Sequence, residues 1–302
     1  MIQLSLVYSP AVNFAMQQNH VPIIRKVVLV NDEDEIIEDV RIRISITPEI
    51  SDEFEKNIDQ IPPKSTIEVK DLKLEISPKY LSELTEKISG EILISVYTGE
   101  ILMLTEKYPV DILPFNQWAG VSVLPEMISA FVTPNYPSIS AIIHRASQFL
   151  EKWTGSPSLD EYQSRNPDRV KKQMAAIYEA IAELNIVYCA PPASYESTGQ
   201  RIRMCDTILT AKIGTCIDMA LLYASCLEAV GINSLIIVIK GHAFAGAWLI
   251  NDTFSDSVND DISLLTKRIA CDQESKMQQK WESECSIIGN SNTSKLGTIM
   301  QR

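Results

Sequence analysis

The sequence has few cysteines and no long apolar segment, and each of these absences excludes a class of protein. Its 302 residues contain six cysteines and three histidines. No two cysteines form a Cys-x-x-Cys pair, so we expect no structural zinc site. No apolar run approaches the roughly 18 residues that span a bilayer, and the opening MIQLSLVYSP lacks the basic segment of a signal peptide. We therefore expect a cytoplasmic protein with no membrane segment and with reduced thiols.

Positive charge is also scarce. The chain has 27 Lys and Arg residues against 39 Asp and Glu residues, which gives a formal net charge of −12. Proteins that bind duplex nucleic acid present a basic face, so we expect no direct nucleic-acid binding. The hydrophobic fraction of 45% and the charged fraction of 22% are ordinary for a globular protein. The length favours two or three domains.

The first 115 residues or so have the pattern of an all-β domain. Apolar and polar residues alternate over residues 40–46 and again over 72–76, which predicts two half-buried strands. Turn-forming residues separate these from other short apolar segments. Those segments are residues 27–30, 92–97, 101–104 and 110–113. About seven short strands at this spacing predict an immunoglobulin-like β-sandwich over residues 1–117.

The pattern becomes helical from Trp118, so the fold class expected for the whole chain is α+β. Residues 139–153 predict an amphipathic helix. Asn166 and Pro167 suit the cap and first position of a second helix, which the spacing of apolar residues extends to about Tyr188. The polar end of the chain, SNTSKLGTIMQR, does not have the pattern of a packed terminus, and the chain could be a fragment of a longer protein.

One cysteine stands at a predicted helix start. In GTCIDMALLYASCLEAVG, Thr215 is a good N-cap, Asp218 completes a capping box, and Gly231 suits the position after the helix end. Cys216 is then the first residue of a helix over about 216–230. The helix dipole and the unbonded N–H groups of the first turn favour a thiolate there and could stabilise an oxyanion. The alternative, a buried structural cysteine, fits Cys226 better.

A histidine is expected to return to this cysteine. The helix carries the chain about 22 Å away from Cys216. A buried strand over residues 233–240 returns it by about 26 Å and ends at Gly241 and His242, before another strand over 243–250. His242 is therefore a candidate catalytic partner of Cys216. Cys226 lies about 15 Å along the helix from Cys216, too far to share a metal ion with it.

These segments resemble a known superfamily. GTCIDMALLYASCLEAVGI followed by GHAFAGAWL resembles transglutaminase-like proteins, with their Gly-x-Cys helix start and later His-Ala-aromatic strand. ELNIVYCAPPASYESTGQRIR and PEMISAFVTPNYP are similar to a branch found in large bacterial proteins that also carry a superfamily-1 helicase. The resemblance covers nearly the whole chain. It implies a β-sandwich over residues 1–117 and a transglutaminase-like, papain-like domain over 118–302, with a helical lead-in at 118–190 and a Cys-His core at 199–290.

The resemblance also implies a papain-like Cys–His–acid site, with Cys216 as nucleophile and His242 as base. Members act as thiol proteases, amide hydrolases or acyl transferases, and some have lost activity. We expect hydrolysis of an amide in a peptide or protein substrate, without a cofactor, in a protein fused to or associated with a helicase and linked to defence. The rival interpretation is an inactive recognition or scaffolding module.

The third catalytic group is expected from a later strand. The strand over 243–250 runs away from His242, which places Asp252 and Asp256 beyond its far end. The next candidate strand, residues 277–286, returns and brings Glu284 back to the histidine. Transglutaminase-like proteins commonly have Asp-Pro-Thr at this point, where this chain has Glu-Cys-Ser. Glu282 is the fallback, and an exposed edge-strand carboxylate is the alternative for Glu284.

Other residues have two interpretations each. Gln200 could complete an oxyanion hole, and Arg203 or its neighbour Arg201 could bind an acidic substrate group. The alternative for all three is a surface loop. Tyr188 and Tyr195 line a cleft or pack in the core or a loop. The polar segment 251–276 is an insertion at the rim of the site or an inert surface loop.

Overall fold

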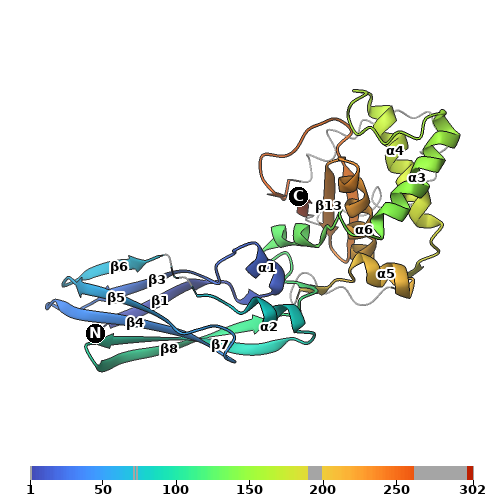
Figure 1. Cartoon of the computed structure of the whole chain (residues 1–302). Coiled ribbons are helices and arrows are strands. Elements are labelled where there is room, and N and C mark those ends of the chain that lie inside the picture. Colours follow the sequence, from blue (N-terminus) through green and yellow to red (C-terminus); the bar gives the residue numbers. More distant parts are fainter. Residues whose placement is uncertain (1, 71, 73, 190–198, 262–297, 302) are drawn as a thin grey trace. The chain divides into compact units, whose positions relative to one another are not determined.

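The computed structural model describes residues 2–70, 72, 74–189, 199–261 and 298–301 (Figure 1). The chain is an α+β protein with several sheets. It divides into two compact units, which are described separately. The first consists of residues 1–127 and 197–201, and the second of residues 128–196 and 202–302. The first unit therefore extends ten residues or so past the boundary at residue 117 that the sequence favours.

Most strands of the first unit belong to two β-sheets. The larger has the strand order β2-β8-β7-β4-β5 and the smaller the order β1-β3-β6. The larger sheet is built from β2 (Ala11–Val12), β4 (Ile37–Thr47), β5 (Phe54–Ile61), β7 (Ile88–Thr98) and β8 (Ile101–Ile112). The smaller is built from β1 (Ile2–Tyr8), β3 (Ile24–Asn31) and β6 (Ser65–Val69). All these pairings are antiparallel except β2 with β8.

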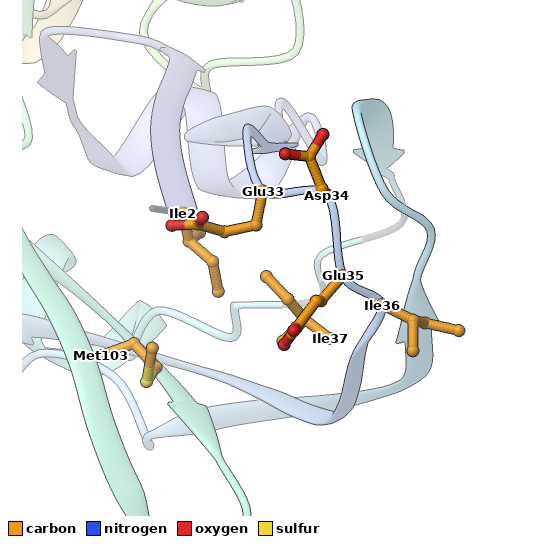
Figure 2. A pocket seen from close by; sticks show the side chains of 7 residues that line it. All are labelled: Ile2, Glu33, Asp34, Glu35, Ile36, Ile37 and Met103. Carbon is orange, nitrogen blue, oxygen red and sulfur yellow. The ribbon is translucent and has the colours of Figure 1, made fainter.

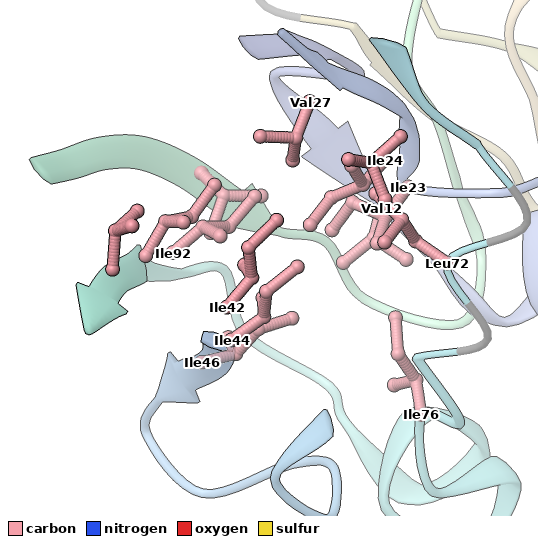
Figure 3. Packing of buried hydrophobic residues seen from close by; sticks show 14 of the residues in the cluster. Val12, Ile23, Ile24, Val27, Ile42, Ile44, Ile46, Leu72, Ile76 and Ile92 are labelled. Carbon is pink, nitrogen blue, oxygen red and sulfur yellow. The ribbon is translucent and has the colours of Figure 1, made fainter. Parts of the chain in front are cut away.

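Both sheets contribute to one hydrophobic core (Figure 3). Val27 of β3 and Ile42, Ile44 and Ile92 of the larger sheet are all completely buried. Side chains of a strand alternate between its two faces, so the polar residues between them point outward. The strand expected over residues 40–46 is thus confirmed. The segments at 101–104 and 110–113 belong to a single long strand, β8, rather than to two strands.

The strand expected over residues 72–76 is wrong. In the described part of this segment, Ile76 makes only an isolated bridge to Ser51. Leu72 and Ile76 nevertheless point into the core, as Figure 3 shows. Leu74 N–H bonds to the carbonyl of Leu72, which is a tight turn rather than a ladder. The alternation therefore reflects insertion of side chains into a core, and helix α2 (Pro78–Glu83) follows at once.

Three long helices form the core of the second unit. These are α3 (Ile139–Thr154), α4 (Pro167–Ala182) and α6 (Cys216–Ala229). The short 3₁₀ helix η1 (Pro125–Phe131) precedes them, and α5 (Cys205–Ala211) lies between α4 and α6 in the chain. Leu150, Ile177, Leu222 and Leu227 are fully buried in the core that these helices share. Most residues of α6 are buried, so it is the central helix of this unit.

A hairpin follows α6. Its strands are β13 (Ser234–Ile239) and β14 (His242–Ala247), in a sheet of order β14-β13-β16-β15 with β15 (Val258–Asn259) and β16 (Thr298–Gln301). The expected strands on both sides of Gly241 are confirmed, with slightly shorter bounds. The expectation of an unpacked chain end is wrong for residues 298–301, because β16 pairs with β13 on one side and β15 on the other.

Helix α4 is shorter than expected. It begins after its Asn166 cap as expected, but it ends at Ala182 instead of near Tyr188. Asn185 has a φ of 53°, a left-handed conformation that stops the helix. The next residues form β10 (Val187–Tyr188), which pairs in parallel with β12 (Ile213–Gly214). This pairing matters for the candidate site.

Candidate active site

Cys216 is the first residue of α6, as expected. The hydroxyl of Thr215 accepts from the N–H of Asp218 at 3.3 Å, and the Asp218 carboxylate accepts from the N–H of Thr215 at 2.9 Å. This reciprocal pair is the predicted capping box, and it fixes where the helix begins. The first-turn N–H groups of a helix lack carbonyl partners within it. The half-buried thiol of Cys216 therefore lies at the positive end of a central helix.

Arg203 supports this helix start. Its guanidinium Nη1 lies 3.0 Å from one oxygen of the Asp218 carboxylate, and its backbone N–H donates to the other oxygen at 2.8 Å. Asp218 is completely buried, whereas the Arg203 side chain is 36% exposed. The carboxylate thus binds the chain ahead of α5 to the N-terminus of α6. The observed contact of Arg203 is structural, and substrate binding by its remaining N–H groups stays a prediction.

Tyr188 lies beside the thiol. Val187 N–H bonds to the carbonyl of Lys212, and Cys189 N–H bonds to the carbonyl of Gly214, both at 2.8 Å. Tyr188 is thereby paired with Gly214, two residues ahead of Cys216. Partial desolvation raises the pKa of Tyr188 above its ordinary value, and the neighbouring Cys216 raises it further through the charge of the ionised sulfur and a side-chain hydrogen bond. Tyr188 therefore interacts with Cys216, although a cleft lined by Tyr188 stays a prediction. No local pattern in the sequence indicates this contact, because the parallel pairing joins segments that are distant along the chain.

His242 begins β14, directly after the turn at Lys240 and Gly241. It is exposed, and its ring stacks on that of Phe244 with centroids 6.4 Å apart. Residues two apart share one face of a strand, so both rings lie on one face of β14. Ala245 and Ala247 lie on the other face and pack into the core that contains α6. The structure therefore places His242 at the hairpin end, with its ring on the face opposite α6.

The lengths still match. The fourteen residues of α6 span about 21 Å, and the six residues of β13, the strand that returns to His242, span about 20 Å. Trp248 N–H bonds to the carbonyl of Asn233, which closes the end of the hairpin far from His242. The backbone carbonyl of Asp252 accepts from Asn233 Nδ2 at 3.0 Å. Asp252 thus lies at the far end, as the strand geometry predicts. Glu282 and Glu284 lie outside the described residues, as do residues 262–276 of the predicted insertion.

Comparisons with known proteins do not identify a family. No protein-family model matches the chain, and no curated protein matches it. Among solved structures, it is similar to a crystal structure of a candidate protease from Parabacteroides distasonis. That match has 14% sequence identity and a TM-score of 0.21, and it covers 70% of this chain. It covers 36% of the other protein, so this chain spans about a third of that length.

Gln200 belongs to the first unit. It forms β11 (Gln200–Arg201), which pairs antiparallel with β9 (Gln117–Trp118). Its side chain is buried, and Nε2 donates to the carbonyl of Arg201 at 3.1 Å. The guanidinium of Arg201 lies 3.1 Å from Glu86 of the same unit. Their described contacts are structural, and a role of Gln200 in an oxyanion hole stays a prediction.

The other helical cysteines are core residues. Cys205 and Cys226 are buried in the core of the second unit, and burial raises the pKa of the Cys226 thiol far above its ordinary value. The structural interpretation of Cys226 is confirmed. In the described part of the chain, no three His, Cys, Asp or Glu residues are grouped as metal ligands. No helix within that part is long and apolar enough to cross a membrane.

A separate hollow of about 340 Å³ lies in the first unit (Figure 2). It is formed by the start of β1, the connection between β3 and β4, and the start of β8. Its lining residues are Ile2, Glu33, Asp34, Glu35, Ile36, Ile37 and Met103. These side chains include carboxylates and apolar groups but neither a thiol nor an imidazole, so the hollow is not a second candidate for the thiol chemistry.

Proposed function

We propose that this chain is a thiol hydrolase of the transglutaminase-like, papain-like type, with an immunoglobulin-like sandwich ahead of the catalytic domain, and that it cleaves an amide bond in a peptide or protein. One observation carries the proposal. Cys216 is the first residue of a capped central helix and is only half-buried, whereas Cys205 and Cys226 are buried in the core. Nucleophilic thiols occur at such helix starts because the helix end favours the thiolate.

The proposed chemistry uses Cys216, His242 and Glu284. His242 takes the thiol proton, and the sulfur forms a bond to the carbonyl carbon while first-turn N–H groups stabilise the oxyanion. The imidazolium returns the proton to the leaving nitrogen, and the C–N bond breaks. Water, deprotonated by His242, then attacks the thioester and releases the acid and the thiol. Glu284 accepts the imidazole N–H and fixes its tautomer.

This pairing requires the first residue of β14 to turn its ring toward α6. The turn residue ahead of it is not packed against other groups, because a Cβ atom added at Gly241 would meet nothing within 4 Å. His242 itself is exposed, so the stack on Phe244 is its only described ring contact that the change would break. The pairing is therefore a proposal that is open to direct test.

The deciding experiment is labelling with a thiol-directed acyl probe. The intact protein is compared with Cys216→Ala and with Cys226→Ala as a matched control in the same helix. We expect labelling of the intact protein and of the control, and none of Cys216→Ala. In parallel, iodoacetamide should alkylate Cys216 well below pH 8 and faster than the other five cysteines. Equal behaviour of all six thiols would favour the rival, an inactive recognition or scaffolding module within a helicase-linked protein.

A further inference from the structure

Tyr188 and Cys216 are brought together by an element that the sequence does not predict. The expected helix would have carried Tyr188 on the end of α4. Instead the chain leaves α4 at Ala182 and runs beside the segment that leads into α6. Two backbone hydrogen bonds, on either side of Tyr188, fix this parallel pairing. This pairing therefore fixes the backbone of Tyr188 beside the segment that leads into Cys216.

We propose that Tyr188 is a positioning residue for Cys216. Its hydroxyl donates a hydrogen bond to the sulfur, which holds the side chain of Cys216 in place at the start of α6 and stabilises the thiolate. Tyr188 is 57% exposed, so its side chain lies at the surface rather than in the core. This inference rests on the proposed nucleophile and adds to it a residue with a defined action.

The chemistry of the two groups suits this direction of donation. A phenol is both donor and acceptor, and a thiolate accepts only. Because the pKa of Tyr188 is raised, its hydroxyl keeps its proton when a neighbouring thiol ionises. The hydrogen bond is thus retained and becomes charge-assisted in the reactive form of the enzyme. A hydrogen bond to the charged form of a group shifts its titration toward that form.

The test is the pH profile of alkylation at Cys216 in the full chain, followed by mass spectrometry of the Cys216 peptide. Tyr188→Phe removes only the hydroxyl. We expect its alkylation midpoint to move upward by about 0.5–1 pH unit, which slows alkylation at pH 7 about three- to tenfold. Tyr178→Phe is the matched control, because Tyr178 is a partly exposed tyrosine on α4, and we expect it to leave the midpoint unchanged.

An unchanged or lowered midpoint in Tyr188→Phe would overturn the inference. A purely structural tyrosine would lower the melting temperature without moving the midpoint, so the melting temperature of each variant is measured as well. The result is separable from the fate of the proposed function. If the acyl probe fails to label the intact protein but the midpoint still moves upward, the positioning role stands and the hydrolase proposal falls. If the probe labels Cys216 and the midpoint does not move, the reverse holds.

Discussion

The carboxylate of Asp218 is completely buried and binds Arg203 twice, through its guanidinium and through its backbone N–H. The same carboxylate caps the helix that begins with Cys216. A buried carboxylate deprived of its cationic partner is costly, because the charge then remains desolvated. The ion pair therefore supports the geometry of the candidate site from inside the protein.

Arg203→Met should consequently destabilise the second unit. We expect the free energy of unfolding to fall by about 2–4 kcal/mol, near the lower end for a broken buried pair because the arginine is partly exposed. Urea unfolding measures this. Lys171→Met is the control, since its pair with Asp168 is exposed and should contribute less than about 1 kcal/mol. Equal effects of the two substitutions would show that Asp218 does not depend on Arg203.

Cys216→Ala should leave the fold intact. It removes one half-buried sulfur at a helix start, so we expect a loss of about 1 kcal/mol in unfolding free energy and a near-normal melting temperature. Acylation should be lost completely. The comparison is made by calorimetry together with probe labelling. A collapse of stability would indicate that the thiol serves the structure instead of a reaction.

His242→Gln should slow acylation of Cys216 by about 100-fold or more, because a general base contributes on that scale. Single-turnover labelling with the acyl probe measures the rate. His144→Gln on α3 is the control and should label at the wild-type rate. If both variants label normally, His242 is not the base. Its ring then stays on the face of β14 opposite α6, where it does not reach Cys216.

Glu284→Gln should slow acylation by about tenfold or more, since the neutral amide no longer stabilises the imidazolium. Glu282→Gln, two residues earlier, is the comparison. A structure of an acylated complex gives a second check through one distance. A Glu284 carboxylate beyond about 5 Å from the His242 ring, with Asp252 or Asp256 nearer, would contradict the assignment.

Stability should decline at alkaline pH through two buried groups of the second unit. Burial raises the pKa of both Cys226 and Tyr223 in the folded protein above their ordinary values of 9.0 and 10.0. The unfolded chain releases these protons first. The stability that they contribute is therefore fully present below about pH 9 and is lost as pH rises above that value, by up to about 1.4 kcal/mol per pH unit for each group.

Cys226→Ala should flatten this decline between pH 9 and 10, as urea unfolding at several pH values would show. A decline of unchanged slope in that variant would rule out Cys226 as its source.

Features that depend on neighbouring residues follow from the sequence alone. The capping box at Thr215 and Asp218, the start of α4 after Asn166, and the alternation over residues 40–46 are local patterns, because caps and strand periodicity involve residues within a few positions of one another. The same locality explains why the residues around Cys216 are enough to place it at a helix start.

Which distant segments meet depends on the tertiary structure. The alternation over residues 72–76 places side chains in the core without forming a strand. Residues 298–301 join a sheet because β13 and β15, which are distant in the sequence, lie where they can pair with them. The neighbours of Cys216 follow the same rule. Strand lengths could bring His242 to its level, but the face of β14 that carries the ring depends on which side α6 packs. Tyr188 reaches the thiol only because β10 pairs with β12, a long-range contact with no local signature.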